Sequence, residues 1–324
     1  MAIYNKPFLS IADQLTLMKN RGIAVTDDPR AQSCVDRIGY YRLSGYSYPF
    51  RRFSQTKDPI TGRIVTVAED DFLPGTNFST IMDLYIFDKK LRLLMLDAIE
   101  RVEVALRVAI AHMLGKRDPE AHLNPAQLHG GFTKKLNWKG TTGHADWLGR
   151  YRECVRRSHE EFVSHFKKKY PNCELPIWMA IEVWDFGLMS MFLQGMKNSD
   201  QLALAQSFGL TREDLIVSWV RAINNVRNAC AHHSRIWNAP VVDYPKPTKP
   251  GEIAYFNHIV GDTNAQTRLY YVVCILRFML LKINPTTTWP ERLKAHLATL
   301  PQGHSISLRR MGFPANWEAE KLWL

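Results

Sequence analysis

The chain has 324 residues, of which 46% are hydrophobic and 23% are charged. These proportions exclude a largely disordered chain, and the length is sufficient for a sizeable hydrophobic core. The formal net charge of +11 favours anionic partners such as nucleic acid, although a basic protein without such a partner remains an open alternative.

Targeting and cysteine patterns favour a cytoplasmic protein. The opening MAIYNKPFLS lacks the charged and apolar regions of a secretory signal. The most apolar run, Tyr270–Ile283, is too short to span a bilayer and contains Arg277 and Lys282, so we predict a buried helix and no membrane contact. The five cysteines are widely separated and form no CxxC pair, which predicts reduced thiols, no metal site and no cofactor.

The first part of the chain predicts a small helical segment followed by a hairpin. Helices are expected at Ser10–Asn20, closed by Gly22, and at Pro29–Ile38, begun by Asp27 and Asp28. Residues 54–76 combine turn signals at Asp58-Pro59 with a short β-branched run, which favours a hairpin or an extended loop. We therefore expect residues 1–76 to form an N-terminal segment.

The remaining residues, 77–324, predict one mainly α-helical domain. A helix of unusual length is expected at Phe78–Leu114, whereas residues 117–143 are rich in Gly, Pro and Asn and predict a loop insertion. Further helical patterns cover residues 146–170, 176–187, 188–196, 199–208, 211–235 and 266–283. The pattern beginning at Thr211 resembles a capping box with acids in the first turn. The fold class is thus an all-α bundle with a short β-hairpin.

Three Arg residues are followed five positions later by a His, and only the context of each pair distinguishes them. The pair Arg117/His122 contains Pro119 in the turn-rich insertion, so no rigid helix would hold its side chains, and we set it aside. The pair Arg227/His232 lies in the predicted helix 211–235, which has one polar and one apolar side at about 100° per residue. The polar face consists of Arg221, Asn224, Asn225, Arg227, Asn228, His232 and Arg235.

The same projection separates the two adjacent histidines. His232 falls on the polar face, whereas His233 falls among apolar residues and is expected to pack in the core. A solvated helix face would normally mix Lys and Glu, but this face contains Arg, Asn and His and no acid beyond the first turn. These groups suit contacts to phosphate and ribose, so the composition favours a functional phosphate-contacting face over a merely solvated one.

The run RNACAHHSRIWN resembles the signature of the Abi-like proteins, abortive-infection proteins of the AbiD and AbiF type within the HEPN superfamily. The segments KPFLSIADQLTLMKNRGIAV, RIGYYRLSGYSYPFRR, AIERVEVALRVAIAH and MGFPANWEAEKLWL fit the same pattern. The resemblance implies a HEPN-like helical bundle with metal-independent endoribonuclease activity at the interface of two HEPN units. Its Arg-Asn-x-x-x-His motif falls on Arg227, Asn228 and His232, the expected catalytic residues.

The pair Arg107/His112 could supply a second motif within the same chain. Glu100, Glu103 and Arg107 share one face of the long helix, where Glu103 and Arg107 can pair, and His112 projects elsewhere. Alternatively, Glu100, Glu103 and Arg107 could position the residues of the Arg227 site without contacting the substrate. A plain structural ion pair is the third alternative.

A second candidate RNA-binding region is basic and aromatic. Arginines alternate with tyrosines between residues 37 and 63, and aromatic rings can stack on unpaired bases while Arg holds phosphate. The candidate residues are Arg37, Tyr40, Tyr41, Arg42, Arg51 and Arg52, with Arg221, Asn224 and Arg235 on the polar face. The tyrosines could equally be core residues. The run Lys167–Lys169 is interpreted as a solvated helix end.

The favoured hypothesis is a toxin-like endoribonuclease of antiviral defence, with RNA as substrate and a homodimer as the assembled form. A bound regulatory RNA, an antitoxin or trigger protein, or incomplete dimer assembly would keep it silent. The alternative is a non-catalytic RNA-binding or scaffolding protein of a defence or toxin-antitoxin system. A metallohydrolase is weaker, because Asp70 and Asp71 have no accompanying ligand motif.

Overall fold

The structure is a computed structural model that describes residues 7–324. Residues 1–6, which include part of the opening used to exclude a secretory signal, lie outside the described residues. The chain divides into two compact units. The first runs to Leu91 and includes Leu293–Arg310, and the second comprises Arg92–Arg292 with Met311–Leu324. The predicted domain boundary between residues 76 and 77 stays a prediction.

Three helices begin the first unit, namely α1 (Ile11–Asn20), α2 (Asp28–Ile38) and α3 (Tyr40–Ser47). Ser10 and Asp13 form a capping box at α1, and Asp27 accepts from the backbone N–H of Arg30 at α2. The sequence did not predict α3. Gly39, with a φ of 91°, separates it from α2 by a turn that glycine adopts without steric cost.

The predicted hairpin is confirmed. Strands β1 (Arg51–Lys57) and β2 (Ile64–Phe72) pair antiparallel, with Lys57 opposite Ile64 and an irregularity between Arg51 and Phe53. Asp58 closes the turn by accepting from the backbone N–H groups of Thr61 and Ile60, and these hydrogen bonds lower the pKa of its carboxyl group. Most hairpin side chains are exposed.

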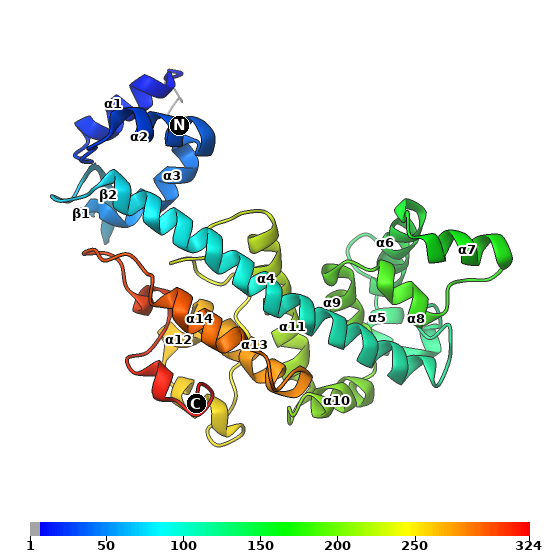
Figure 1. Cartoon of the computed structure of the whole chain (residues 1–324). Helices are drawn as coiled ribbons and strands as arrows, with labels where there is room; N and C mark the ends of the chain where they lie inside the picture. Colours follow the sequence, from blue (N-terminus) through cyan, green and yellow to red (C-terminus); the bar gives the residue numbers. More distant parts are fainter. Residues whose placement is uncertain (1–6) are drawn as a thin grey trace. The chain divides into compact units, whose positions relative to one another are not determined.

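The long helix is also confirmed as α4 (Phe78–Gly115), which continues from the first unit into the second (Figure 1). Its apolar residues recur at helical spacing and are fully buried at Leu84, Met95, Val102 and Ile110. This spacing gives α4 a continuous apolar stripe.

The second unit is built almost entirely of helices, so the mainly α-helical class is confirmed. Its elements are η2 (Pro125–Gln127), α5 (Gly130–Thr133), α6 (Gly143–Arg157), α7 (Glu161–Lys169), α8 (Ile177–Ala180), η3 (Ile181–Val183), α9 (Phe186–Gly195), α10 (Asn198–Ser207), α11 (Glu213–Ala231), η4 (Ala254–Ile259), α12 (Thr263–Thr267), α13 (Leu269–Ile283) and η6 (Trp317–Ala319). Helix α14 (Trp289–Leu297) and η5 (Leu308–Met311) extend across the division between the units. Over residues 7–324, no helix combines the length and apolar character that a membrane span requires.

Two of the apolar clusters in the core of the second unit position the helices around the candidate site. Helix α11 packs against α9, α10 and α13, and the fully buried Trp219 donates from Nε1 to the carbonyl of Lys246 at 3.0 Å. A separate aromatic cluster gathers Trp147, Tyr151 and Trp184 around His122, with ring centroids 5.2–6.3 Å from the imidazole. These clusters hold α6, α9 and α11 in place.

Several predicted helices have different limits in the structure. The pattern 176–187 covers α8, η3 and the start of α9, with Trp184 extended between them. The pattern 146–170 is two helices, because Ser158 and Glu160 adopt extended backbone conformations between α6 and α7. The expected capping box at Thr211 is wrong. The Thr211 hydroxyl donates to Glu252 instead, Arg212 occupies the cap position, and Arg212 pairs with Glu252 at 2.7 Å. A residue distant in sequence has replaced the local cap.

Candidate active site at the end of helix α11

Arg227, Asn228 and His232 lie together on the last turns of α11. Arg227 donates from Nη1 to Oδ1 of Asn228 at 3.4 Å, and both residues are half-buried. His232 is the C-cap residue, where its backbone N–H donates to the carbonyl of Asn228 at 2.9 Å, and its side chain is exposed. The guanidinium and the amide are therefore carried by the last turns of α11 and are partly accessible, and the imidazole follows at the C-cap and is exposed.

Helix α11 ends in a Schellman motif centred on His233. The N–H of Ser234 donates to the carbonyl of Ala229 at 2.8 Å, and the N–H of His233 donates to that of Cys230 at 3.1 Å. His233 has a φ of 58°, the left-handed conformation that glycine adopts most easily at this position. The helix therefore stops at Ala231, four residues before the predicted end.

The expected burial of His233 is wrong, because this side chain is exposed. The helical projection assumed about 100° of rotation per residue through residue 235, and the left-handed turn at 233 invalidates it. Arg235 likewise lies beyond the helix and is half-buried, so it is not part of the α11 face. The two adjacent histidines are both accessible, in different backbone conformations.

We expect His233→Gly to raise the free energy of unfolding by about 0.5–1 kcal/mol. A non-glycine residue in the left-handed region costs about 1–2 kcal/mol, and the greater freedom of glycine in the unfolded chain offsets part of the gain. Urea denaturation would measure the change, with Asn316→Gly (φ of 59°) as the control in which a smaller gain is expected, since Asn tolerates this region. A loss of stability in His233→Gly would show that contacts of the imidazole outweigh the backbone cost.

A buried arginine fixes the chain that follows the two histidines. Arg92 of α4 is 4% exposed and donates from Nη1 to the carbonyl of Ser234 at 3.4 Å. Both residues belong to the second unit. The end of α11 is thus tied to a second helix, which limits its local motion.

The rest of the polar face is partly neutralised by an acid from outside the helix. Arg221 lies 3.7 Å from Asp243, and Asn225 donates from Nδ2 to the same carboxylate at 2.6 Å. Asp243 belongs to the Pro-rich segment after α11, so its position could not be predicted from helical periodicity. Arg221 is consequently a weaker candidate for phosphate than Arg227, whose hydrogen bond is to a neutral amide.

Asn224 lies beside a second arginine that the sequence did not single out. Around Gly187 of α9, a Cβ atom built on the glycine would lie 3.8 Å from both Arg150 Nη2 and Asn224 Nδ2. Arg150 also lies 3.8 Å from Asp185, and the buried Oδ1 of Asn224 has no hydrogen-bond partner in residues 7–324. Arg150 comes from α6, and no local pattern distinguishes it from the other arginines of that helix.

The pair Glu103/Arg107 has a structural role. Arg107 donates to Glu103 at 2.6 Å and to the carbonyls of Glu182 and Trp184 at 2.9 and 2.7 Å. It thereby holds the chain immediately before Asp185, which caps α9. These contacts give Arg107 a structural role next to the cap of α9.

Glu100 and His112 are exposed. Across the part of the chain that the structure describes, no hydrogen bond or ion pair joins Glu100, Glu103, Arg107 or His112 to Arg227 or His232. Their role as a second motif or as support for the Arg227 site therefore stays a prediction.

The pair Arg117/His122 is a structural feature as well. Arg117 makes a two-pronged contact with Asp200 at 3.0 and 2.8 Å, which raises the pKa of its guanidinium. His122 is fully buried in the aromatic cluster, and this burial lowers its pKa to about 3. A neutral histidine in the interior cannot act on a substrate.

The basic and aromatic candidates of the N-terminal segment lie in the first unit and have mixed environments. Tyr41 is 79% exposed, and Arg37, Arg42 and Arg52 are exposed as well. Tyr40 instead accepts from Arg21, and Arg51 lies 3.6 Å from Asp70 and over the ring of Phe72. Only part of this set is available to a partner.

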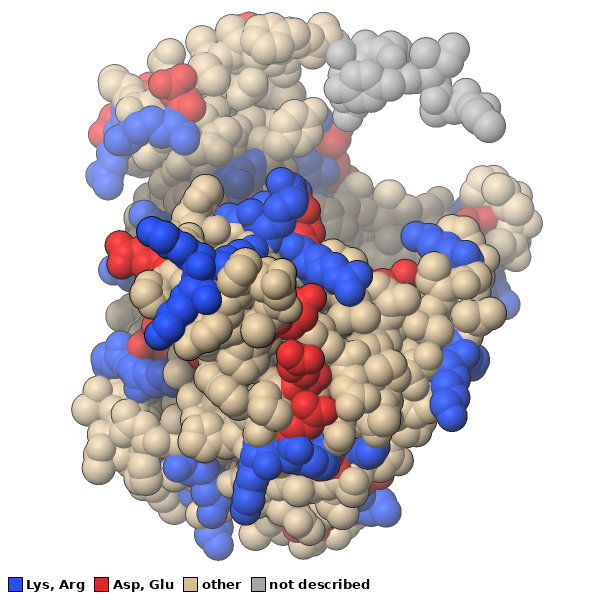
Figure 2. All heavy atoms as spheres, turned by 90° about the vertical axis from the view of Figure 1, so that its right-hand side faces the viewer, with Lys and Arg blue, Asp and Glu red and all other residues tan. Residues whose placement is uncertain are grey.

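The surface carries both basic and acidic side chains (Figure 2). Figure 2 shows Lys and Arg in several separate groups on one face, with a column of acidic side chains between them. No group of three His, Cys, Asp or Glu residues in a metal-binding arrangement occurs in residues 7–324. At the end of α11 the side chains available for chemistry are the Arg227 guanidinium, the Asn228 amide and the exposed His232 imidazole.

The family model described as "Abi-like protein" matches residues 33–238, which is more than half of the chain and includes the whole of α11. Neither the curated proteins nor the solved structures contain a significant match.

Proposed function

Since the chain belongs to the Abi-like protein family, we propose that it is a metal-independent, HEPN-type endoribonuclease of abortive-infection defence. The observation that carries this proposal is the arrangement of Arg227, Asn228 and His232 on the accessible end of α11. The end of one helix carries a proton acceptor, a positive charge and a neutral amide within two turns. A base and a positive charge promote cleavage of a phosphodiester through the 2′-OH, and an amide can position the reacting groups.

In the proposed reaction, His232 takes the proton of the ribose 2′-OH. The 2′-oxygen then bonds to the phosphorus, and the bond from phosphorus to the 5′-oxygen breaks. Arg227 stabilises the charge that develops on the phosphoryl oxygens, and Asn228 orients His232 or the substrate. The products are a 2′,3′-cyclic phosphate and a 5′-hydroxyl, so DNA would not be cut.

The departing 5′-oxygen needs a proton, and the His232 of a second copy could donate it. A homodimer with the two α11 ends facing each other would supply one imidazole as base and one as acid. A dimeric site is preferred to a second motif within the chain because Arg107 is already engaged by Glu103 and by the carbonyls of Glu182 and Trp184. Regulation by a bound RNA, an antitoxin or a trigger protein would act on the access of RNA or on this assembly.

We expect cleavage of single-stranded RNA to continue at an unchanged rate in excess EDTA and to leave 2′,3′-cyclic phosphate ends. The reason is that the ribose supplies the nucleophile and protein side chains supply the proton transfer and charge stabilisation. Gel analysis of purified full-length protein with end-labelled RNA, followed by phosphatase sensitivity of the ends, would measure both. Loss of activity in EDTA that Mg²⁺ restores would contradict the mechanism. RNA binding without cleavage by the activated protein would favour the non-catalytic alternative.

A further inference from the structure

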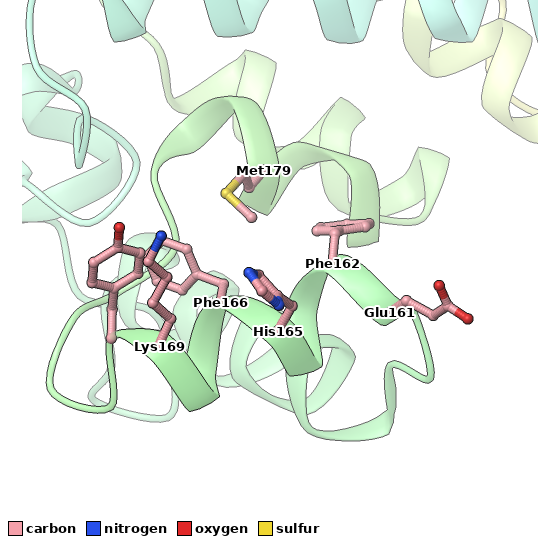
Figure 3. Close-up of a pocket in the computed structure, with 7 residues that line it drawn as sticks. Glu161, Phe162, His165, Phe166, Lys169 and Met179 are labelled. Carbon is pink, nitrogen blue, oxygen red and sulfur yellow. The ribbon is translucent and has the colours of Figure 1, made fainter.

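An open cavity of about 460 Å³ lies between α7 and α8, apart from the polar face of α11. Its lining consists of Glu161, Phe162, His165, Phe166, Lys169, Tyr170 and Met179. In Figure 3, Met179 points from α8 toward the side chains of Phe162, His165 and Phe166, which rise from α7. No residue of α11 contributes to this cavity.

The spacing along α7 explains why these side chains meet. Phe162, His165, Phe166 and Lys169 are three, four and seven positions apart, so they occupy one face of the helix. Val163 turns to the other side and is buried, which anchors α7 to the protein. The face with two Phe residues is left open, and the last turn ends in three consecutive lysines.

The chemistry of the lining combines flat apolar surfaces with positive charge. The rings of Phe166 and Tyr170 lie 5.2 Å apart at 49°, and Lys169 Nζ lies 5.4 Å from the Tyr170 ring. Tyr170 is 44% exposed. A suitable ligand therefore has a planar group that can contact aromatic rings and an anionic group within reach of Lys169.

We propose that this cavity is an accessory site for one unpaired nucleotide of an RNA strand. The base would stack on Phe166 and Tyr170, with His165 or Glu161 at its polar edge, and Lys169 would contact the phosphate. Lys167 and Lys168 extend the positive charge along the strand, against a single acid, Glu161, in the lining. This charge balance favours a polyanion over an uncharged apolar segment. The inference rests on the proposed function, because it assigns a second contact for the same substrate.

The pair Trp138 and Lys139 offers a matched control. Trp138 is 90% exposed, and Lys139 Nζ lies 5.1 Å from its ring, so this is also a lysine beside an exposed aromatic ring. Neither residue lines the cavity. Substitutions in the two pairs therefore compare the same chemistry inside and outside the proposed site.

The experiment measures binding of a fluorescent, single-stranded 2′-fluoro RNA to the full-length protein by anisotropy. The 2′-fluoro groups remove the proposed nucleophile, so the wild-type chain can be used without cleavage. We expect Tyr170→Ala to raise the Kd about tenfold through loss of stacking. Lys169→Ala should reduce the slope of log K against log salt by about 0.7, the value for one phosphate of a single strand. Trp138→Ala and Lys139→Ala should leave the Kd and the slope unchanged.

Photo-crosslinking with 4-thiouridine in the same strand gives an independent readout that does not depend on variant stability. Crosslinks within residues 162–170 are expected. Crosslinks only elsewhere, or equal effects of the cavity and control substitutions, would overturn the assignment. An acidic peptide could also be added to the protein–RNA complex. If the peptide occupies the cavity and the RNA stays bound, the cavity is a site for a protein partner instead.

These outcomes separate the two proposals. If the cavity substitutions weaken RNA binding and the wild-type protein cuts no RNA, the accessory site stands and the nuclease proposal fails. If RNA is cut and the cavity substitutions have no effect on binding, the nuclease proposal stands and the accessory site fails.

Discussion

Arg227→Ala and His232→Ala should each reduce the rate of RNA cleavage by at least about 10²-fold while leaving RNA binding within a few-fold of wild type. A positioned general base contributes about 10²–10⁴-fold, and a group that stabilises developing charge contributes about 10²–10³-fold. Because both side chains lie at the accessible end of α11, their truncation should cost little stability. Single-turnover cleavage of end-labelled RNA, with Kd measured in parallel, would test the expectation.

Arg30→Ala and His159→Ala are suitable controls, because both residues are exposed and neither belongs to the proposed site. They should cleave RNA at the wild-type rate. Retention of full activity by His232→Ala would exclude His232 as the base, and the neighbouring exposed imidazole of His233 would become the alternative. A parallel loss of binding and cleavage in Arg227→Ala would assign this residue to substrate affinity.

The second large effect concerns acid stability. We expect the free energy of unfolding to fall by about 2 kcal/mol between pH 6.5 and pH 5 through His122 alone. Burial, and next the neighbouring His144, lower the pKa of His122 from 6.5 to about 3. The folded protein therefore keeps this imidazole neutral, whereas the unfolded chain takes up a proton below pH 6.5. The stabilisation is complete above pH 6.5 and is lost as the pH falls toward 3.

Urea denaturation at several pH values would measure this dependence, and His122→Phe provides the comparison. Phenylalanine keeps an aromatic ring among Trp147, Tyr151 and Trp184 and cannot be protonated, so the slope of stability against pH should flatten by about one proton. Burial also lowers the pKa values of His258 and His296, so some acid sensitivity should remain. An unchanged slope in His122→Phe would mean that the imidazole is protonated in the folded protein.

The elements that sequence could predict are those fixed by local chemistry. The stripe of apolar residues in α4 and the turn around Asp58 depend on neighbours in the chain, and both are found in the structure. The helix α3 was missed because its tyrosines also suit a strand or an RNA-binding loop. The predicted start of α11 was wrong because the Thr211 hydroxyl donates a hydrogen bond to Glu252, about forty positions away, and does not cap the helix.

The same distinction applies to the candidate site. The motif Arg227, Asn228 and His232 lies on consecutive turns, so helical spacing alone placed its members together. Asp243 and Arg150 were missed because they come from a loop and from another helix. The exposure of His233 was missed because a left-handed residue at a helix end is normally a glycine, and the sequence has none there. Local periodicity cannot report such a turn.

The first unit of the fold is discontinuous in sequence, which matters for any shortened version of the gene. Its part after Leu293 supplies His296, which stacks on Phe87 at 4.5 Å and bonds the carbonyl of that residue at 2.9 Å. A premature stop codon before this segment would leave Phe87 without its covering ring, even though the whole N-terminal stretch is still translated. Substitutions in Leu293–Arg310 should therefore destabilise the unit that is otherwise formed by residues up to Leu91.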